Sequence, residues 1–500
     1  MTSSRHRFNS PKLQFRLGII GIFLISLLLR FWGLSRFNTL VFDEVYYAEF
    51  ANNYITNTPF FNAHPPLSQY IIALGIWIGS RLPFGQDTVN DLAGSTLSTW
   101  SYRWMNALTG AFIPLIAGAI AYQLTSRRSY TLLATLLIAV DGLFLVESRY
   151  ALNNIYIVIF GLLAQLFFIL SLKVEQMQRW IMLIASGICF GATVAVKWNG
   201  LGYWLGIILL LIAAWVIKFT ENENQNQTED LPAIPSPPSP LENLTQLSVL
   251  QLIISLSVIP ILFYVLAWIP HLQISPEPGL WELQTTILRY HKSLGSGTEI
   301  HPYCSAWYTW PLTLRPIAYF YEKVDNLTAL DPSVPPPSFT PAIYDVHAMG
   351  NPPLWWFSVG AILLTIWVLF KRINIESKVK NRFSHSESKT IDDSIRFLPK
   401  IELGLLLYLL INWVANWTPW ITVTRCVFLY HYMSAFVFAA LILAWWIDRS
   451  LQSDFPVFRL IGTVVVFLII LGFVFWMPIF LGLPLSPEQW KMRMWFPSWI

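Results

Sequence analysis

Long apolar runs separated by short polar segments make up most of this chain, and the alternation predicts a bundle of membrane-spanning helices. A helix that crosses a bilayer needs roughly 20 mostly apolar residues. About eleven runs come near that length, so the predicted fold is an all-α polytopic membrane protein. The predicted spans are residues 17–32, 104–124, 130–145, 155–172, 180–196, 201–217, 247–268, 354–370, 403–414, 427–447 and 460–481.

Composition and charge agree with a membrane protein. Hydrophobic residues are 55% of the 500-residue chain and charged residues only 12%, which excludes an ordinary soluble globular domain. The net charge of +4 comes from basic residues beside the spans, so it indicates topology and not binding of nucleic acid. If the spans alternate, these basic clusters share one side, which the positive-inside rule makes the cytoplasm. The N-terminus is then cytoplasmic as well.

Two polar stretches are too poor in apolar residues to pack, and we expect them to be cytoplasmic linkers. They cover residues 221–240 and 374–400. The predicted organisation is an N-terminal transmembrane module at 1–218, a linker at 219–246 and a C-terminal transmembrane module at 247–500. The C-terminal module carries a large outer loop at 270–353 and a cytoplasmic linker at 371–400.

An acidic pair, Asp43 and Glu44, follows the first apolar run. From Asp43 the sequence DEVYYAEFANNYI has apolar residues at the spacing of an amphipathic helix, which we expect on the outer membrane surface. Asp43 could cap this helix, and Glu44 could favour its positive end. A catalytic role for the pair is the alternative, because charges near membrane depth are costly unless they are functional or paired.

Other polar groups fall on the same predicted outer side. His64 precedes two prolines in FFNAHPPLSQ, Arg149 lies in ESRYALNN, and Lys197 lies in AVKWNG. Each cation could simply extend to the membrane surface, with Glu147 as a partner for Arg149. Together, an acid and several fixed cations at a lipid boundary would suit attack by a hydroxyl on a substrate whose leaving group is a lipid-linked phosphate.

The three cysteines lack metal-ligand spacing. Cys304 and Cys426 are the two that can face outward, whereas Cys189 falls within a predicted span. The sequence assigns none of them a role.

A series of motifs, in order along nearly the whole chain, resembles the protein O-mannosyltransferase family, which has the GT-C membrane fold. The motifs are FDEVYYAEFA, FFNAHPPLSQ, SYRWMNALTG, ESRYALNN, GATVAVKWNGLGY, HPYCSAWYTWPL, GNPPLWW and RCVFLYHY. The resemblance implies a GT-C glycosyltransferase with about eleven transmembrane helices and outer-face amphipathic loop helices. It also implies a metal-independent, inverting transfer of mannose from polyprenyl-phosphate-mannose to Ser or Thr hydroxyls of exported proteins.

The resemblance assigns roles to individual residues. Asp43 aligns with the family's base, and Glu44 would orient the acceptor or the pocket. Arg149 is the first candidate to bind the lipid phosphate, followed by Arg425 and Lys197. The expected substrate-binding residues are His64, His301, Trp307 and Trp310, although packing of the outer loop explains the last three equally well.

Two departures from the family pattern matter. Many members have an acid where this chain has Asn154, so the role of that acid does not transfer. The loop at 270–353 also has no room for the MIR domain of eukaryotic relatives. We therefore expect a bacterial-type enzyme of the plasma (inner) membrane with an extracytoplasmic active site. Its partners would be the donor lipid, membrane lipid and Ser/Thr-containing exported polypeptides, without a cofactor.

Three alternatives remain from the sequence. The same fold could modify a lipid or glycan hydroxyl, because fold resemblance does not fix the acceptor. A transporter or flippase would also need membrane charges, but those proteins place them near the bilayer midplane, often in two related halves. A metal site at Asp43, Glu44 and His64 is chemically conceivable, although the resemblance argues against it.

Overall fold

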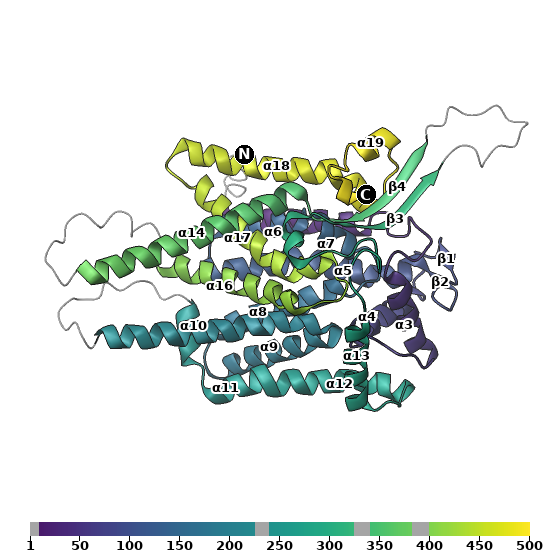
Figure 1. Ribbon diagram of the computed structural model, residues 1–500, viewed down its shortest axis with the longest axis horizontal. Coiled ribbons are helices and arrows are strands. Elements are labelled where there is room, and N and C mark those ends of the chain that lie inside the picture. The colour runs from purple at the N-terminus through teal and green to yellow at the C-terminus, as the bar shows by residue number, and fades with distance from the viewer. Residues whose placement is uncertain (1–9, 226–239, 325–340, 383–399) are drawn as a thin grey trace, which may run out of the picture.

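The computed structural model describes residues 10–225, 240–324, 341–382 and 400–500. It is a bundle of roughly parallel and antiparallel helices with smaller elements gathered at one end (Figure 1). Nine helices in the described part of the chain are long and apolar enough to cross a membrane. They contain α2 (Pro11–Phe31), α5 (Thr99–Thr125), α8 (Asn154–Ser171), α9 (Gln176–Val196), α10 (Leu201–Gln225), α12 (Ile259–Ile274), α14 (Pro352–Arg382), α17 (Met433–Leu451) and α18 (Pro456–Leu481). A further long helix, α16 (Lys400–Trp417), covers the ninth predicted span.

Every predicted span falls on a helix, but the third is wrong in detail. Two helices, α6 (Arg128–Ala139) and α7 (Gly142–Glu147), replace the single span expected at 130–145. The break comes at Asp141, whose carboxylate accepts the Phe144 N–H at 3.0 Å and so caps α7. Its other oxygen accepts the indole N–H of Trp355 at 2.6 Å, which ties the break to α14.

Three other predicted spans differ from the structure in their extent. The seventh span begins with α11 (Val249–Ile253) and reaches α12 through a π-helical stretch, Ile254–Val258. Helices α10 and α14 run on to Gln225 and Arg382, so the predicted linkers begin later than expected. The first linker was predicted to run to residue 246, but its last residues form the 3-10 helix Pro240–Gln246. Residues 226–239 and 383–399 lie outside the described residues.

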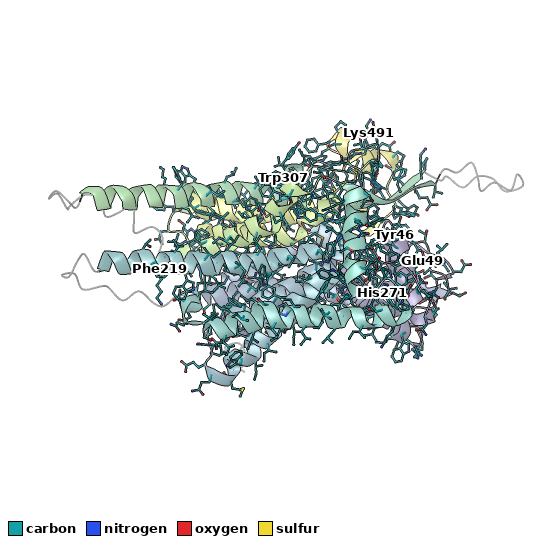
Figure 2. The ribbon with its side chains drawn as sticks, turned by 60° about the horizontal axis from the view of Figure 1, so that its bottom comes forward. Tyr46, Glu49, Phe219, His271, Trp307 and Lys491 are labelled. Atoms are coloured by element: carbon teal, nitrogen blue, oxygen red, sulfur yellow. A yellow bond between two sulfur atoms is a disulfide. The ribbon has the colours of Figure 1, made fainter. Side chains whose placement is uncertain are left out.

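The elements expected on the outer side lie together at one end of the bundle (Figure 1). Figure 2 shows the same separation, with Tyr46, Glu49 and His271 at one end and Phe219 at the other. The short elements at this end are α3 (Glu44–Thr56), α4 (Leu67–Gly79), α13 (Leu280–Ser293), α19 (Pro487–Lys491), β1 (Val89–Asn90), β2 (Leu97–Ser98), β3 (Ile317–Val324) and β4 (Ala342–Ala348).

The strands form two antiparallel pairs that the sequence did not predict. β1 pairs with β2, and β3 pairs with β4, with a register shift between Ala318 and Phe320. Short 3-10 helices complete the fold; they are η1 (Trp198–Gly200), η2 (Pro240–Gln246), η4 (Trp307–Leu312), η6 (Thr418–Thr422), η7 (Leu429–Tyr432) and η8 (Pro497–Trp499).

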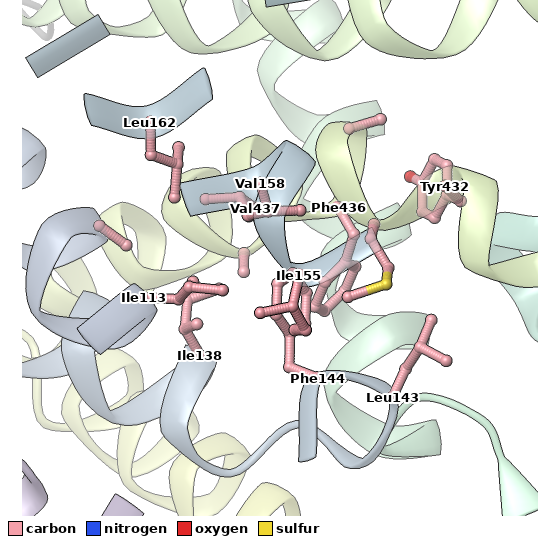
Figure 3. Packing of buried hydrophobic residues seen from close by; sticks show 14 of the residues in the cluster. Ile113, Ile138, Leu143, Phe144, Ile155, Val158, Leu162, Tyr432, Phe436 and Val437 are labelled. Atoms are coloured by element: carbon pink, nitrogen blue, oxygen red, sulfur yellow. The ribbon is translucent and has the colours of Figure 1, made fainter. Parts of the chain in front are cut away.

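The core surrounds α17, which is buried along almost its whole length. Figure 3 shows Phe436 and Val437 of α17 packed among apolar side chains of α5, α6, α7 and α8, including Ile113, Ile138 and Phe144. This packing fixes the helix ends from which the polar residues of the outer side project.

Candidate active site

The turn that carries the acidic pair has an unusual backbone. Phe42 has a φ of 51°, a left-handed conformation that costs a residue with a large side chain about 1–3 kcal/mol. Its ring stacks on Tyr319 at a centroid distance of 4.4 Å and meets the rings of His301 and Phe428 edge-on, each at 6.0 Å. This aromatic packing holds the turn and directs the next residue, Asp43.

Asp43 occupies the N-cap position of α3, but its side chain makes no capping hydrogen bond. The structure therefore does not support the capping role. The hydroxyl of Tyr430 lies 3.5 Å from Asp43 Oδ2. Burial raises the pKa of Asp43 to about 6, while the positive charge of Lys197 and the Tyr430 hydroxyl oppose that rise. A carboxyl with this pKa is mostly ionised at neutral pH, so Asp43 can accept a proton there.

Glu44, by contrast, is fully buried and bound on both oxygens. Arg103 Nη2 lies 2.7 Å from Oε2, and Arg103 Nε donates to Oε1 at 2.9 Å. The backbone N–H groups of Val41 and Ala151 also donate to this carboxylate, each at 2.9 Å. Glu44 therefore has no free oxygen for an acceptor hydroxyl, and its geometry positions the turn that bears Asp43.

Two cations, Lys197 and Arg425, line a cavity of about 510 Å³ beside this turn. Lys197 follows the end of α9, and its ammonium lies 5.4 Å from the centre of the Tyr430 ring. Within the described parts of the chain, neither cation has a carboxylate within ion-pair distance. Lys197 is buried and Arg425 is partly exposed. Because a buried cation without a partner is costly, this cavity suits an anionic ligand.

The cavity also contains two histidines in contact. His64 and His291 stack with ring centres 5.1 Å apart, and His291 Nε2 lies 2.9 Å from the Ala63 carbonyl oxygen. Burial, with Lys197 and other neighbouring cations, holds the pKa of His64 well below its usual range. Burial likewise lowers the pKa of His291 to about 4. Both rings are therefore neutral at physiological pH.

The rest of the cavity wall is mainly apolar. It is formed by η1, the start of α10, the end of α16, η6 and one face of α13, and its residues include Trp198, Leu201, Trp204, Leu205, Leu288 and Trp420. A cationic end joined to an apolar wall fits an amphiphile with an anionic head group.

Arg149, the first phosphate candidate from the sequence, has a different setting. Its guanidinium is buried and is not among the residues that line the cavity. It donates four hydrogen bonds of 2.8–3.1 Å to backbone carbonyls near the end of α2, those of Leu29, Arg30, Trp32 and Gly33. Helix ends leave carbonyls without partners, so Arg149 caps α2 and does not face an anion here.

Of the three outer-loop residues expected to bind substrate, one borders the site and two pack within the protein. His301 is partly exposed and lies against Phe42 and Phe428, next to the Asp43 turn. Trp310 is fully buried, and its indole N–H donates to Ser305 at 2.8 Å. Trp307 packs on Trp417 at 5.0 Å. The two tryptophans therefore pack within the protein, whereas His301 borders the site.

Sequence reasoning missed the position of Glu147, a second buried carboxyl. Glu147 was considered only as a partner for Arg149, but it is fully buried and accepts hydrogen bonds from Tyr319 and from Asn154, the latter at 3.1 Å. Asn154 thus stabilises a second carboxyl of the site. The available signal was that Glu147 lies in the ESRYALNN motif.

A disulfide between Cys304 and Cys426 was also missed. The available signal was that both cysteines lie in segments predicted to be on the outer side. Across the four described segments of the chain, no three His, Cys, Asp or Glu side chains are grouped so that they could hold a metal ion.

The helix bundle with its polar site at one end is that of a polytopic membrane protein, and its family match and structural neighbour place it among the GT-C glycosyltransferases. Residues 20–275 match the model of the dolichyl-phosphate-mannose-protein mannosyltransferase family, and residues 278–499 match the C-terminal four-transmembrane region of protein O-mannosyltransferases. The chain belongs to this family of mannosyltransferases, as the motif resemblance predicted.

Bacterial relatives match over most of both chains. The polyprenol-phosphate-mannose–protein mannosyltransferase of Mycolicibacterium smegmatis is 22% identical, over 92% of this chain and 88% of its own. The enzyme of the same name from Corynebacterium glutamicum is 23% identical, over 96% and 92%. The solved structure of the S. cerevisiae protein O-mannosyltransferase Pmt1-Pmt2 complex bound to the sugar donor superposes with a TM-score of 0.73 at 15% identity, covering 98% of this chain and 93% of that chain. That likeness confirms the fold.

Proposed function

We propose that this chain transfers mannose from polyprenyl-phosphate-mannose to Ser or Thr hydroxyls of exported polypeptides, outside the cytoplasm. The family and the names of the bacterial relatives support the donor and the protein acceptor. The observation that carries the proposal is the carboxylate of Asp43, which makes no capping hydrogen bond, beside a cavity whose two cations, Lys197 and Arg425, have no carboxylate partner among the described residues.

The chemistry follows from that arrangement. Asp43 accepts the proton of the acceptor hydroxyl, and the hydroxyl oxygen attacks the anomeric carbon of mannose. The bond from that carbon to the phosphate oxygen breaks, and polyprenyl phosphate leaves with the electron pair. Attack opposite the leaving group inverts the anomeric configuration. A positioned base of this kind contributes about 10²–10⁴-fold to the rate.

The leaving group needs charge stabilisation more than it needs a proton. Phosphate is already an anion when it departs, and Lys197 and Arg425 are cations fixed in a site of low dielectric, where such stabilisation is strongest. The apolar wall beyond them, from Trp198 to Leu205 and at Trp420, suits the first units of the polyprenyl chain. The phosphate and the start of the polyprenyl chain thus each have a matching part of the cavity.

Two features support placement of the site on the extracytoplasmic side of the membrane. The basic residues that flank the spans predict a cytoplasmic N-terminus. The Cys304–Cys426 disulfide lies at the site end of the bundle, and disulfides persist in oxidising compartments.

The first experiment measures transfer of radiolabelled mannose from polyprenyl-phosphate-mannose to a Ser/Thr-rich peptide in membranes. The parent is compared with Asp43→Asn at equal protein level, and Glu49→Gln serves as a control because Glu49 is exposed on the same helix. We expect the parent and Glu49→Gln to transfer and Asp43→Asn to lose about 10²–10⁴-fold. Equal activity in Asp43→Asn would remove Asp43 as the base. If the parent does not transfer mannose to the peptide but does transfer it to a lipid or glycan hydroxyl, the acceptor is not a protein.

A further inference from the structure

The disulfide between Cys304 and Cys426 joins two segments that are far apart in the chain, with a sequence separation of 122. Cys304 lies in the loop before η4, and Cys426 lies in the loop between η6 and η7. Neither loop has regular secondary structure to fix its course. The proposed chemistry does not use this bond, so its position needs a separate explanation.

The position of Cys426 explains why the disulfide is where it is. Cys426 directly follows Arg425, and the Arg425 guanidinium donates to the Cys426 carbonyl at 3.1 Å. The Cys426 N–H donates to Gly295 O at 2.8 Å, and the Ser305 N–H donates to Val427 O at 2.9 Å. One covalent bond and two backbone hydrogen bonds therefore tie the Arg425 segment to the loop at 295–305.

The two hydrogen bonds differ in how well they hold this segment. The Ser305–Val427 bond is at the buried Val427, on the C-terminal side of Cys426. The bond to Gly295 is in an exposed stretch, residues 295–300, and backbone hydrogen bonds in exposed loops open locally at little cost in free energy. The disulfide stays closed through such openings. Without it, the Arg425 loop would sample positions outside the cavity, and a cation that is often elsewhere binds an anion more weakly.

We propose that the Cys304–Cys426 disulfide is a positioning element that holds Arg425 in the cavity for the phosphate of the donor lipid. This inference rests on the proposed function, in which Arg425 binds that phosphate. The oxidised protein is the form with high donor affinity. A dithiol reductant would convert the pair to two thiols, itself closing to a cyclic disulfide, and would release the loop.

The test is a cycle of four purified proteins: parent, Cys304→Ser/Cys426→Ser, Arg425→Met, and the triple variant. For each, kcat, the donor KM, the peptide KM and the thermal midpoint are measured below the lowest midpoint of the set. We expect the serine pair to raise the donor KM severalfold, no further than Arg425→Met does, with the peptide KM unchanged. In the Arg425→Met background the serine pair should add nothing to the donor KM.

Two controls separate positioning from general stability. Dithiothreitol should raise the donor KM of the parent but not that of the serine pair. If the serine variant does not fold, the parent is compared with Arg425→Met instead, and dithiothreitol should raise the donor KM of the parent but not that of Arg425→Met. Cys189→Ser removes the cysteine of α9, which is not disulfide-bonded, and should behave as the parent does.

An unchanged donor KM after loss of the disulfide would overturn the inference. A second result would also overturn it: the serine pair lowers kcat and the thermal midpoint by the same amount in the parent and in the Arg425→Met background. That result indicates a structural role alone. A parent that transfers no mannose would overturn the proposed function and this inference together, whereas a transferring parent isolates the inference.

Discussion

Glu44 and Arg103 form a fully buried ion pair in which two hydrogen bonds, of 2.7 and 2.9 Å, join guanidinium to carboxylate. Arg103 also donates to the carbonyls of Leu34, Phe37 and Thr39. The pair therefore links the start of α5 to the whole loop that leads into α3. Two adjacent acids consequently have different roles: Glu44 fixes the loop, and Asp43 remains free beside the cavity.

Removal of one partner of this pair should destabilise the protein. We expect Glu44→Gln to cost about 3–5 kcal/mol, because a buried guanidinium is left without its counter-charge. The thermal midpoint of the detergent-solubilised protein checks this, with Glu49→Gln as the control on the same helix. Activity per folded molecule should fall less than in Asp43→Asn. A Glu44→Gln protein of parental stability would show that the pair contributes little.

The pH dependence of kcat/KM should be bell-shaped. Asp43 acts as a base only when ionised, so activity should rise with pH through its pKa of about 6. Burial, and the repulsion from Arg425, lower the pKa of Lys197 to about 8, and this group must be charged to bind phosphate. Activity should therefore fall again above about pH 8. Initial rates at subsaturating donor from pH 5 to 9 measure both limbs, and a flat profile would contradict these assignments.

Replacement of Lys197 by Met should change both limbs in defined directions. The Lys197 charge favours ionised Asp43 and lowers the pKa of that carboxyl. Without it the Asp43 pKa rises, so the acid limb should move to higher pH while the basic limb disappears. Lys218→Met is the matched control, because Lys218 lies on α10 and is exposed. An acid limb that stays in place would show that Lys197 and Asp43 are not electrostatically linked.

The helices follow from the sequence because the length of an apolar run decides whether it can cross a bilayer, and the outer position of His64, Lys197 and Asp43 follows from span alternation. The partners of these groups do not follow. Glu44 meets Arg103 across 59 residues, and Arg149 meets the end of α2 across more than 100. Such contacts depend on how the helices pack. The motif resemblance predicted that both Arg149 and Arg425 bind phosphate. Only the fold shows that Arg425 lines the cavity, whereas Arg149 binds carbonyls at the end of a helix.

Arg149 and Arg425 should therefore have separable effects. Arg149→Met leaves four carbonyls without their donor, so we expect a lower thermal midpoint with little change in donor KM. Arg425→Met removes a cation from the cavity and should raise donor KM about 10–100-fold, which matches about 1.5–3 kcal/mol for a charge-assisted bond, with little change in midpoint. Donor titrations and melting curves on both proteins test this. The reverse pattern would restore Arg149 as the phosphate-binding residue.

Removal of divalent metal should leave transfer intact. Asp43, Glu44 and His64 are the residues that a metal would need, but Glu44 is held by Arg103, and Lys197 and Arg425 place positive charge in the cavity that His64 lines. A divalent cation would meet that charge at close range, and the phosphate already has its counter-ions. Dialysis against EDTA, followed by assay without and with Mg²⁺ or Mn²⁺, measures the effect. Loss of activity on chelation that one of these ions restores would contradict charge stabilisation by Lys197 and Arg425 alone and would reassign Asp43 as a ligand.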